Sequence, residues 1–201
     1  MRFNPAFEDR PDEAMIIARI LGGYGELEFL LAVCLGNVLG DTKKALRVFF
    51  RTRGETARIA TADALAVDDY ANAGFKAPYA DALGAMRGAL KLRNAFAHSH
   101  WVALNVEPYN VHGLFYVALG ESALPSESFT YEWMHAEINL LKQMEGYCAY
   151  ARQALMYLDA EWQAKRSGKP NLVVPKAKKR QPPTPRIVVD PNTLKWLPKS
   201  L

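Results

Sequence analysis

Residues 79–98 read YADALGAMRGALKLRNAFAH, and this stretch decides the fold of the chain. Its apolar side chains recur at steps of three and four residues, at Tyr79, Leu83, Met86 and Leu90. That spacing predicts a helix with one buried face. The same rhythm continues to Arg93, Asn94 and Ala97, so polar groups stand where the pattern calls for leucine. A buried arginine must either be paired in the interior or line a cleft.

The segments around this helix predict a mainly α fold, an up-and-down helical bundle with a small β-hairpin insertion. Capping residues, prolines and glycines bound four helices, at about 11–40, 42–53, 55–73 and 78–98. Alternating apolar and polar residues then predict two strands, at 100–106 and 111–119. A final helix is expected to begin at Thr130, its N-cap, and to end near Gly168.

A basic, proline-rich and extended tail follows the final helix. We therefore expect one helical domain at residues 1–167 and a tail at residues 168–201 that is mobile when nothing binds it. Within the tail, residues 186–189 suit a short strand.

Positive charge is concentrated in that tail. The whole chain carries a formal charge of +4, but residues 168–201 hold eight lysines and arginines against one aspartate, which leaves +7 in the tail and −3 elsewhere. Such a block indicates either an anionic partner, such as nucleic acid, or simply a solvated tail. The densest cations, which we take as candidate nucleic-acid contacts, are Lys176, Lys178, Lys179 and Arg180.

The histidines do not indicate a metal site, and no sequence motif indicates a cofactor. We expect neither, because the spacing of the histidines is not that of metal ligands. His135 falls off the apolar seam expected for the final helix, so its side chain is expected to be solvated. The four histidines are His98, His100, His112 and His135.

Apolar runs and cysteines favour a soluble, cytoplasmic protein. The most apolar run, residues 29–40, is shorter than the roughly 20 residues that cross a bilayer. Cys34 and Cys148 both lie in apolar helical patterns without the spacing of a disulfide framework, which is typical of buried free thiols.

Glu28 is a second polar residue in an apolar position, on the buried face of the first long helix. A buried carboxylate needs a cation or a donor, and Arg93 is the partner that we predict for it. A buried ion pair of this kind stabilises a fold about as much as packed apolar residues of similar size would, so stability alone is a weak reason for its presence. Glu28 would instead hold the guanidinium for a phosphate, whose oxygens match the planar fork of arginine. Tyr24, one turn earlier, could hydrogen-bond nearby or belong to the core.

Three polar residues at the end of the 78–98 helix form the candidate catalytic group. Asn94 and His98 are four residues apart and share a side of the helix. We assign His98 the role of general base or acid, Arg93 the phosphate contact, and Asn94 an orienting hydrogen bond. Such a group could activate a ribose 2′-hydroxyl without a metal. The alternative is that Arg93 and His98 are structural.

Two motifs together resemble the HEPN superfamily. One is Arg93-Asn94-x-x-Ala97-His98 followed by Trp101, and the other is the Gly-Tyr-Gly-Glu-Leu-Glu stretch that ends at Glu28. The resemblance covers about residues 12–165 and implies a small all-α bundle. It further implies a symmetric dimer, in which the motifs of two copies meet in one cleft. His100 and Trp101 would line the rim of this cleft or pack within the hairpin.

Three alternatives for function remain, the first two implied by the resemblance and the third by the basic tail. The first is a metal-independent endoribonuclease that acts on RNA as a toxin or an anti-phage defence effector, with an inhibitor or antitoxin protein as a further partner. The second is a non-catalytic HEPN-like module for dimerisation or for binding nucleic acid or protein. The third is a protein of a phage or mobile element in which the tail, rather than the bundle, acts.

Overall fold

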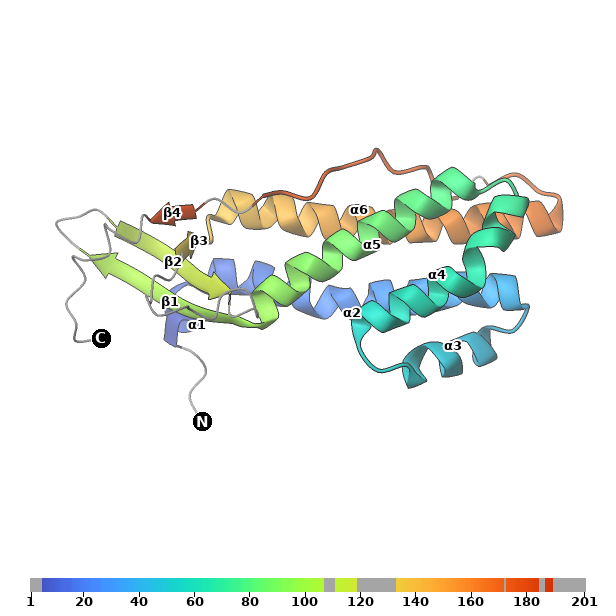
Figure 1. Ribbon diagram of the computed structural model, residues 1–201. Coiled ribbons are helices and arrows are strands. Elements are labelled where there is room, and N and C mark those ends of the chain that lie inside the picture. The colour runs from blue at the N-terminus through green and yellow to red at the C-terminus, as the bar shows by residue number, and fades with distance from the viewer. Residues whose placement is uncertain (1–4, 107–110, 119–132, 172, 185–186, 190–201) are drawn as a thin grey trace. The chain divides into compact units, whose positions relative to one another are not determined.

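The computed structural model describes residues 5–106, 111–118, 133–171, 173–184 and 187–189 (Figure 1). These residues form a mainly helical protein with a small antiparallel sheet, as the sequence predicts. The chain divides into two compact units. One unit combines residues 22–91 with 146–182, and the other combines residues 1–21, 92–145 and 183–201. We call them the helical unit and the sheet unit, and we describe each by itself.

Five long helices contribute to the helical unit. They are α2 (Pro11–Leu39), α3 (Thr42–Arg51), α4 (Glu55–Asn72), α5 (Lys76–Ala97) and α6 (Ile138–Ser167). The unit boundaries fall within α2, α5 and α6. The sequence predicted α2 to α5 within a few residues of these bounds.

Local signals explain where these helices begin and end. The Asp41 carboxylate accepts a hydrogen bond from the Lys44 backbone N–H at 3.0 Å and caps α3. Gly54 precedes α4 with a φ of 82°, and Gly74 follows α4 with a φ of 86°. Glycine adopts this left-handed region without the steric cost that a side chain adds.

The core of the helical unit is built from the apolar faces that the periodicity indicated. Its fully buried side chains include Leu31, Leu35, Phe49, Tyr70, Met86 and Leu155. Tyr70 stacks on Tyr79 with ring centroids 4.8 Å apart, and its hydroxyl donates to the Cys34 carbonyl at 2.9 Å. Burial of these side chains supplies most of the stability of such a unit.

Polar contacts fix the alignment of α2 and α5 against α6. From α6, Arg152 donates to the Glu26 carboxylate at 2.8 Å, and Gln163 donates to the Asn37 side-chain oxygen at 2.8 Å. The Tyr150 hydroxyl donates to Asp81 of α5 at 2.7 Å. These bonds favour one register of the helices over a slipped one.

The sheet unit holds four strands in the order β1-β2-β3-β4, with every neighbouring pair antiparallel. They are β1 (Ser99–Val106), β2 (Val111–Ala118), β3 (Trp133–His135) and β4 (Ile187–Val189). The predicted hairpin is therefore confirmed in β1 and β2, with Trp101 opposite Tyr116. The predicted short strand is confirmed in β4. A short helix, α1 (Pro5–Asp9), also belongs to this unit and was not predicted.

One predicted element is wrong at its start. We expected the final helix to begin at Thr130, but residues 133–135 form strand β3, and α6 begins at Ile138. Thr130 itself lies outside the described residues. Pairing with β2 takes precedence over helix formation here, because Phe115 and Tyr116 offer partners to His135 and Met134. The Ala136 N–H also donates to the Leu114 carbonyl at 2.8 Å.

The first part of the tail lies along α6, although we expected a mobile segment (Figure 1). Asn171 donates to the Glu161 carboxylate at 3.1 Å, and Gln153 donates to the Pro175 carbonyl at 3.4 Å. Further along, Lys179 lies 3.5 Å from Asp81. The tail therefore runs antiparallel to α6. Among the described helices, none combines the length and the apolar character that a membrane span requires.

Two glycines one turn apart on α5 provide a test of this packing. A Cβ at Gly88 would lie 2.3 Å from the Tyr147 hydroxyl oxygen and 2.8 Å from its ring, whereas a Cβ at Gly84 would meet nothing within 4 Å. Gly84→Ala should raise the free energy of unfolding by up to about 1 kcal/mol, because alanine favours helices. Gly88→Ala should lower it by about 1–3 kcal/mol, because the buried Tyr147 ring must move. Urea denaturation measures both, and equal stabilisation by the two variants would contradict the described contact.

The two cysteines should differ sharply in reactivity. Burial raises the pKa of the Cys34 thiol to about 12, and Cys34 is 1% exposed. Cys34 should therefore react with a thiol reagent at pH 8 at least about 100-fold more slowly than Cys148, because the thiolate is the nucleophile. Because the folded pKa is raised, stability should also fall as the pH rises from about 9 towards 12. Rapid labelling of native Cys148→Ala protein would contradict this burial.

Candidate active site

The three predicted catalytic residues lie in one short segment at the end of α5, where Arg93 and Asn94 contact each other through their side chains. Arg93 and Asn94 are half-buried near its C-terminal end, and the Arg93 Nη1 donates to the Asn94 side-chain oxygen at 2.9 Å. The His98 backbone N–H donates to the Asn94 carbonyl at 3.1 Å, which extends the helical pattern just beyond Ala97. Asn94 therefore binds Arg93 through its side chain and His98 through its backbone.

His98 itself is exposed and directly follows α5. The Ser99 hydroxyl donates to the Ala95 carbonyl and Trp101 Nε1 to the Phe96 carbonyl, so three of the last carbonyls of the helix are satisfied at this end. A guanidinium offers planar donors that match phosphate oxygens, and an imidazole can accept or donate a proton near neutral pH. The group thus contains the parts for binding a phosphate and moving a proton.

The two supporting residues of the hairpin have different environments. Trp101 is 6% exposed, stacks near Tyr116 at a centroid distance of 4.9 Å, and donates from Nε1 to the Phe96 carbonyl at 3.3 Å. It therefore packs in the sheet unit and joins the end of α5 to β1, rather than lining a cleft rim. His100 is exposed and, by strand alternation, lies on the opposite face of β1 from Trp101.

The partner of Glu28 is a correction to the sequence analysis. We predicted Arg93, but Glu28 accepts a hydrogen bond from Arg58 Nη1 of α4 at 2.9 Å. Arg58 also donates from Nε to the Thr52 carbonyl at 3.0 Å. A signal was present in the sequence, because Arg58 directly precedes the seam residue Ile59 and so borders the buried face of α4. Tyr24, the other supporting residue on α2, is 4% exposed and belongs to the core.

The candidate nucleic-acid contacts of the tail are all exposed. Lys179 shares its charge with Asp81 at 3.5 Å, and the Arg180 guanidinium lies close to Gly146 of α6. The other two cations of this group are Lys176 and Lys178. The tail thus presents a basic strip while it lies along α6.

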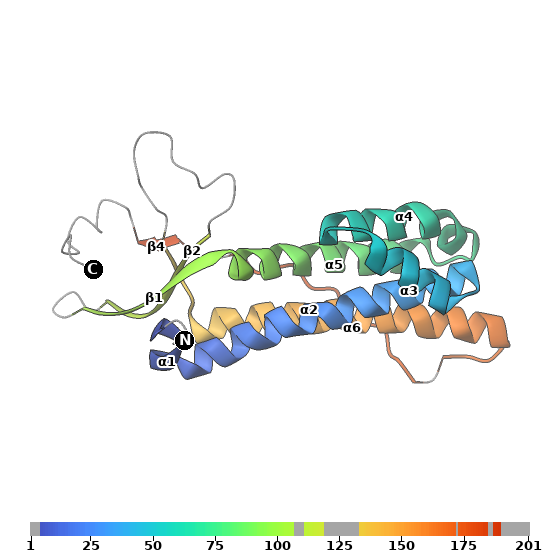
Figure 2. The same ribbon diagram turned by 90° about the horizontal axis from the view of Figure 1, so that it is seen from below.

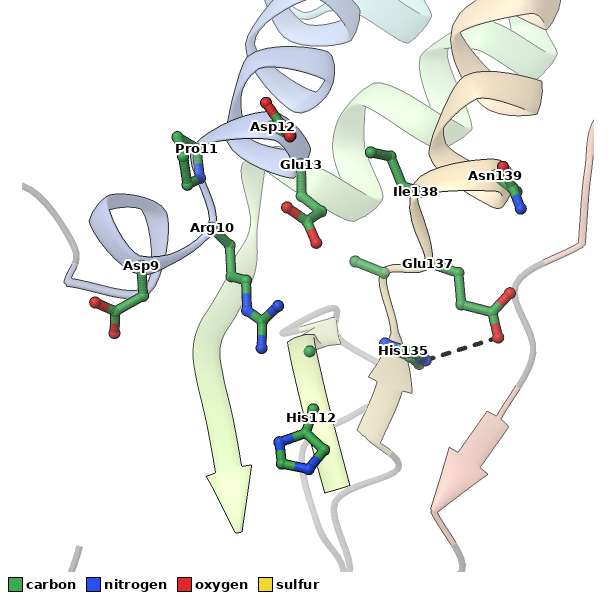
Figure 3. Close-up of a pocket in the computed structure, with 12 residues that line it drawn as sticks. Asp9, Arg10, Pro11, Asp12, Glu13, His112, His135, Glu137, Ile138 and Asn139 are labelled. Atoms are coloured by element: carbon green, nitrogen blue, oxygen red, sulfur yellow. Dashed lines mark ion pairs between the residues drawn. The ribbon is translucent and has the colours of Figure 1, made fainter. Parts of the chain in front are cut away.

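The sheet unit contains a pocket that the sequence analysis did not predict. Its volume is about 550 Å³, and it is lined by the residues that begin α2, by β2, and by the link from β3 to α6 (Figure 3). Arg10, between α1 and α2, and Glu13, in the first turn of α2, reach into it. His112, His135 and Glu137 line its other sides.

His135 is held firmly in this pocket, although we expected it to be solvated. Its ring stacks on Phe115 at a centroid distance of 4.7 Å, and its Nδ1 lies 3.7 Å from a Glu137 carboxylate oxygen. The side chain is 22% exposed. Gly113 leaves room for it, because a Cβ there would lie 2.3 Å from His135 Nε2 and the backbone has a φ of 147°.

The charges of the pocket decide what it can bind. His112 Nδ1–H donates to the Asn105 side-chain oxygen, so two ordered imidazoles line the volume. Arg10 is outnumbered by four carboxylates, those of Asp9, Asp12, Glu13 and Glu137, which disfavour a phosphate here. Sequence reasoning missed the pocket because its lining comes from three segments far apart in the chain. Among the described residues, no cluster of histidines, cysteines or carboxylates could hold a metal ion.

No protein-family model, curated protein or solved structure matches this chain. The resemblance to the HEPN superfamily therefore stays a prediction, and the function must be argued from the residues themselves.

The corrected pairing of Glu28 can be tested with two arginine variants. Arg58→Ala should lower the free energy of unfolding by roughly 2–4 kcal/mol, because Glu28 would remain buried without its cation. Arg87→Ala is the matched control: its pair with Asp63 has a similar length, 2.8 Å against 2.9 Å, but the Arg87 side chain is 52% exposed. It should cost less than about 1 kcal/mol. Equal decreases in the free energy of unfolding for Arg58→Ala and Arg87→Ala, measured by chemical denaturation, would show that the Glu28–Arg58 pair is no more important than an exposed pair.

Proposed function

We propose that this protein is a metal-independent endoribonuclease whose catalytic residues are Arg93, Asn94 and His98. The observation that supports the proposal is the hydrogen-bonded arrangement at the end of α5. Asn94 holds the Arg93 guanidinium at 2.9 Å and the His98 backbone at 3.1 Å, next to an exposed imidazole. Phosphate recognition and proton transfer are therefore available within one short segment.

In the proposed reaction, neutral His98 removes the proton from a ribose 2′-hydroxyl as its oxygen attacks the adjacent phosphorus. Arg93 stabilises the negative charge that grows on the phosphoryl oxygens. The bond from phosphorus to the 5′-oxygen breaks, and that oxygen takes a proton from an acid. The products are a 2′,3′-cyclic phosphate and a free 5′-hydroxyl. Asn94 orients the guanidinium and is a positioning residue.

The proposed reaction requires a homodimer, in which each copy supplies one His98 imidazole. A single imidazole cannot be base and acid in the same step, whereas a second copy of His98 can supply the proton for the leaving oxygen. The resemblance of this motif to HEPN proteins suggests a symmetric dimer of this kind and a role as a toxin or defence effector in the cytoplasm. An inhibitor or antitoxin protein would then be a natural partner.

A second candidate is a non-catalytic module that binds RNA or protein. The pairing of Glu28 with Arg58 favours it, because the acid that was expected to hold Arg93 is already engaged at 2.9 Å. Under this alternative, Arg93 and Asn94 stabilise the end of α5, and His98 is a solvated surface residue.

Single substitutions separate the two candidates. Wild-type protein should cleave RNA in the presence of EDTA, and His98→Ala should slow cleavage about 10²- to 10⁴-fold, as loss of an acid–base group does. Arg93→Lys keeps the charge but loses the planar fork, and it should also slow cleavage. Lys91→Ala, an exposed cation on the same helix, is the control and should cleave at the wild-type rate.

Gel electrophoresis of a labelled RNA, with thermal unfolding of each variant, makes the comparison. Cleavage that persists in His98→Ala, or that requires a divalent cation, would contradict the ribonuclease proposal. RNA binding without cleavage by the wild-type protein would favour the non-catalytic module.

A further inference from the structure

Helix α3 carries an unusual concentration of positive charge on its exposed side. Its ten residues read TKKALRVFFR, and its buried side is formed by Ala45 and Phe49. At about 100° per residue, the exposed cations and Phe50 fall within roughly one third of the helix circumference. These residues, which we call the α3 face, are Lys43, Lys44, Arg47, Phe50 and Arg51.

Within the helical unit, the α3 face points away from the neighbouring helices. Figure 1 shows α3 beside α4, and Figure 2 shows that no other helix of this unit covers its outer side. In the described part of the chain, none of the four cations of the α3 face forms an ion pair. The Asp41 carboxylate, which directly precedes α3, is used as the N-cap.

This arrangement works against the stability of α3 itself. Lys43 and Lys44 lie in the first turn, where the helix dipole disfavours cations, and α3 has no acidic residue there. Arg47 is four residues from both Lys43 and Arg51, and like charges at that spacing repel by about 0.2–0.5 kcal/mol per pair. Two lysines in the first turn and two like-charge pairs on ten residues indicate that the charge serves binding rather than folding.

Phe50 adds an aromatic surface to these cations. It is 45% exposed, and its ring is fixed by two neighbours. The Arg58 guanidinium lies over the ring at 5.5 Å from its centroid, and Phe49 packs edge-on at 5.2 Å. Because Glu28 holds Arg58, the position of the ring is tied to the core of the unit.

Cations beside an exposed aromatic ring are the groups that proteins use to bind single-stranded nucleic acid. Lys43, Arg47 and Arg51 follow one another at about 6 Å along the helix axis, so the row can track a phosphate backbone over a few nucleotides. A base can stack against the aromatic ring, whatever its identity. A membrane surface fits less well, because the apolar side of α3 is packed inside the unit and cannot enter a bilayer.

We propose that the α3 face is a binding site for single-stranded RNA that does not discriminate between base sequences. The site is separate from Arg93, Asn94 and His98, and it stands with either candidate function. It also differs from the sequence-based expectation that the tail supplies the nucleic-acid contacts. If the protein is a ribonuclease, the α3 face binds part of its RNA substrate. If it is a non-catalytic module, RNA binding by the α3 face is its function.

The test is fluorescence anisotropy of the full-length protein with a labelled 2′-O-methyl oligouridylate, which cannot be cleaved at its 2′-oxygens. Lys43→Glu/Arg47→Glu should weaken binding at least about 10-fold and lower the salt dependence, because the loss of two phosphate contacts reduces the slope against log salt by about 1.4. Phe50→Ala should weaken binding by roughly 5- to 150-fold, the effect of losing one stacked base.

Matched controls separate a loss of RNA contacts at the α3 face from a change in net charge and from unfolding of α3. Lys142→Glu/Arg166→Glu changes the net charge by the same amount at two exposed positions of α6 and should alter binding less than about 3-fold. The substitution Lys43→Glu places an acid in the first turn of α3, so it should not unfold the helix. A melting temperature equal to or slightly above that of the wild-type protein would verify this.

Several outcomes would overturn the proposal. One is unchanged binding in Lys43→Glu/Arg47→Glu together with loss in Lys178→Glu/Arg180→Glu, which would assign the contacts to the tail. Another is binding to phosphatidylserine vesicles or to polyglutamate, but not to the oligonucleotide. A third is equal weakening of RNA binding by Lys142→Glu/Arg166→Glu, which would show that binding depends on net charge alone.

Discussion

The ion pair between Glu28 and Arg58 is the interaction on which much of the helical unit depends. Glu28 is 8% exposed, and a carboxylate at that depth is costly unless a cation reaches it. Arg58 reaches it from α4 at 2.9 Å and also binds the end of α3 through the Thr52 carbonyl. One guanidinium thereby ties three helices together and lies over the Phe50 ring. The basic face of α3 is held in place by the core through this residue.

The pairing of Glu28 with Arg58 also affects the candidate active site. Glu28 was expected to neutralise Arg93 and hold it for a phosphate, but it is engaged elsewhere. Arg93 is instead oriented by Asn94, a neutral amide, at 2.9 Å. An amide fixes the direction of a guanidinium through a hydrogen bond, and the guanidinium keeps the planar donors that match phosphate oxygens. Loss of the expected acid therefore removes one supporting contact but leaves the proposed phosphate contact intact.

Most of the fold could be predicted because it depends on local patterns. The spacing of Tyr79, Leu83, Met86 and Leu90 reports directly which side of α5 is buried, and Asp41 and Gly74 mark helix ends through backbone chemistry. Strand β3 could not be predicted in this way. Residues 133–135 follow a helical rhythm, and only the neighbouring strand β2 makes an extended conformation better for them.

The sites were harder to predict than the elements, for the same reason. Arg93 and Asn94 are neighbours in the sequence, so their side-chain contact is local in the chain. The partner of Glu28 lies on another helix, and the pocket around His135 is assembled from three separate segments. Periodicity shows that a side chain is buried, but it does not show which distant residue it meets. The sequence analysis did not identify the α3 face, because its interpretation depends on Phe50 being exposed and fixed.

A double-mutant cycle tests this account most directly. Stability is measured for Glu28→Gln, Arg58→Met, Arg93→Met and the two double variants that include Glu28→Gln. The account predicts a coupling free energy between Glu28 and Arg58 of at least about 1 kcal/mol, and near-additive effects for Glu28 and Arg93. Strong coupling between Glu28 and Arg93, with additive effects for Glu28 and Arg58, would contradict it.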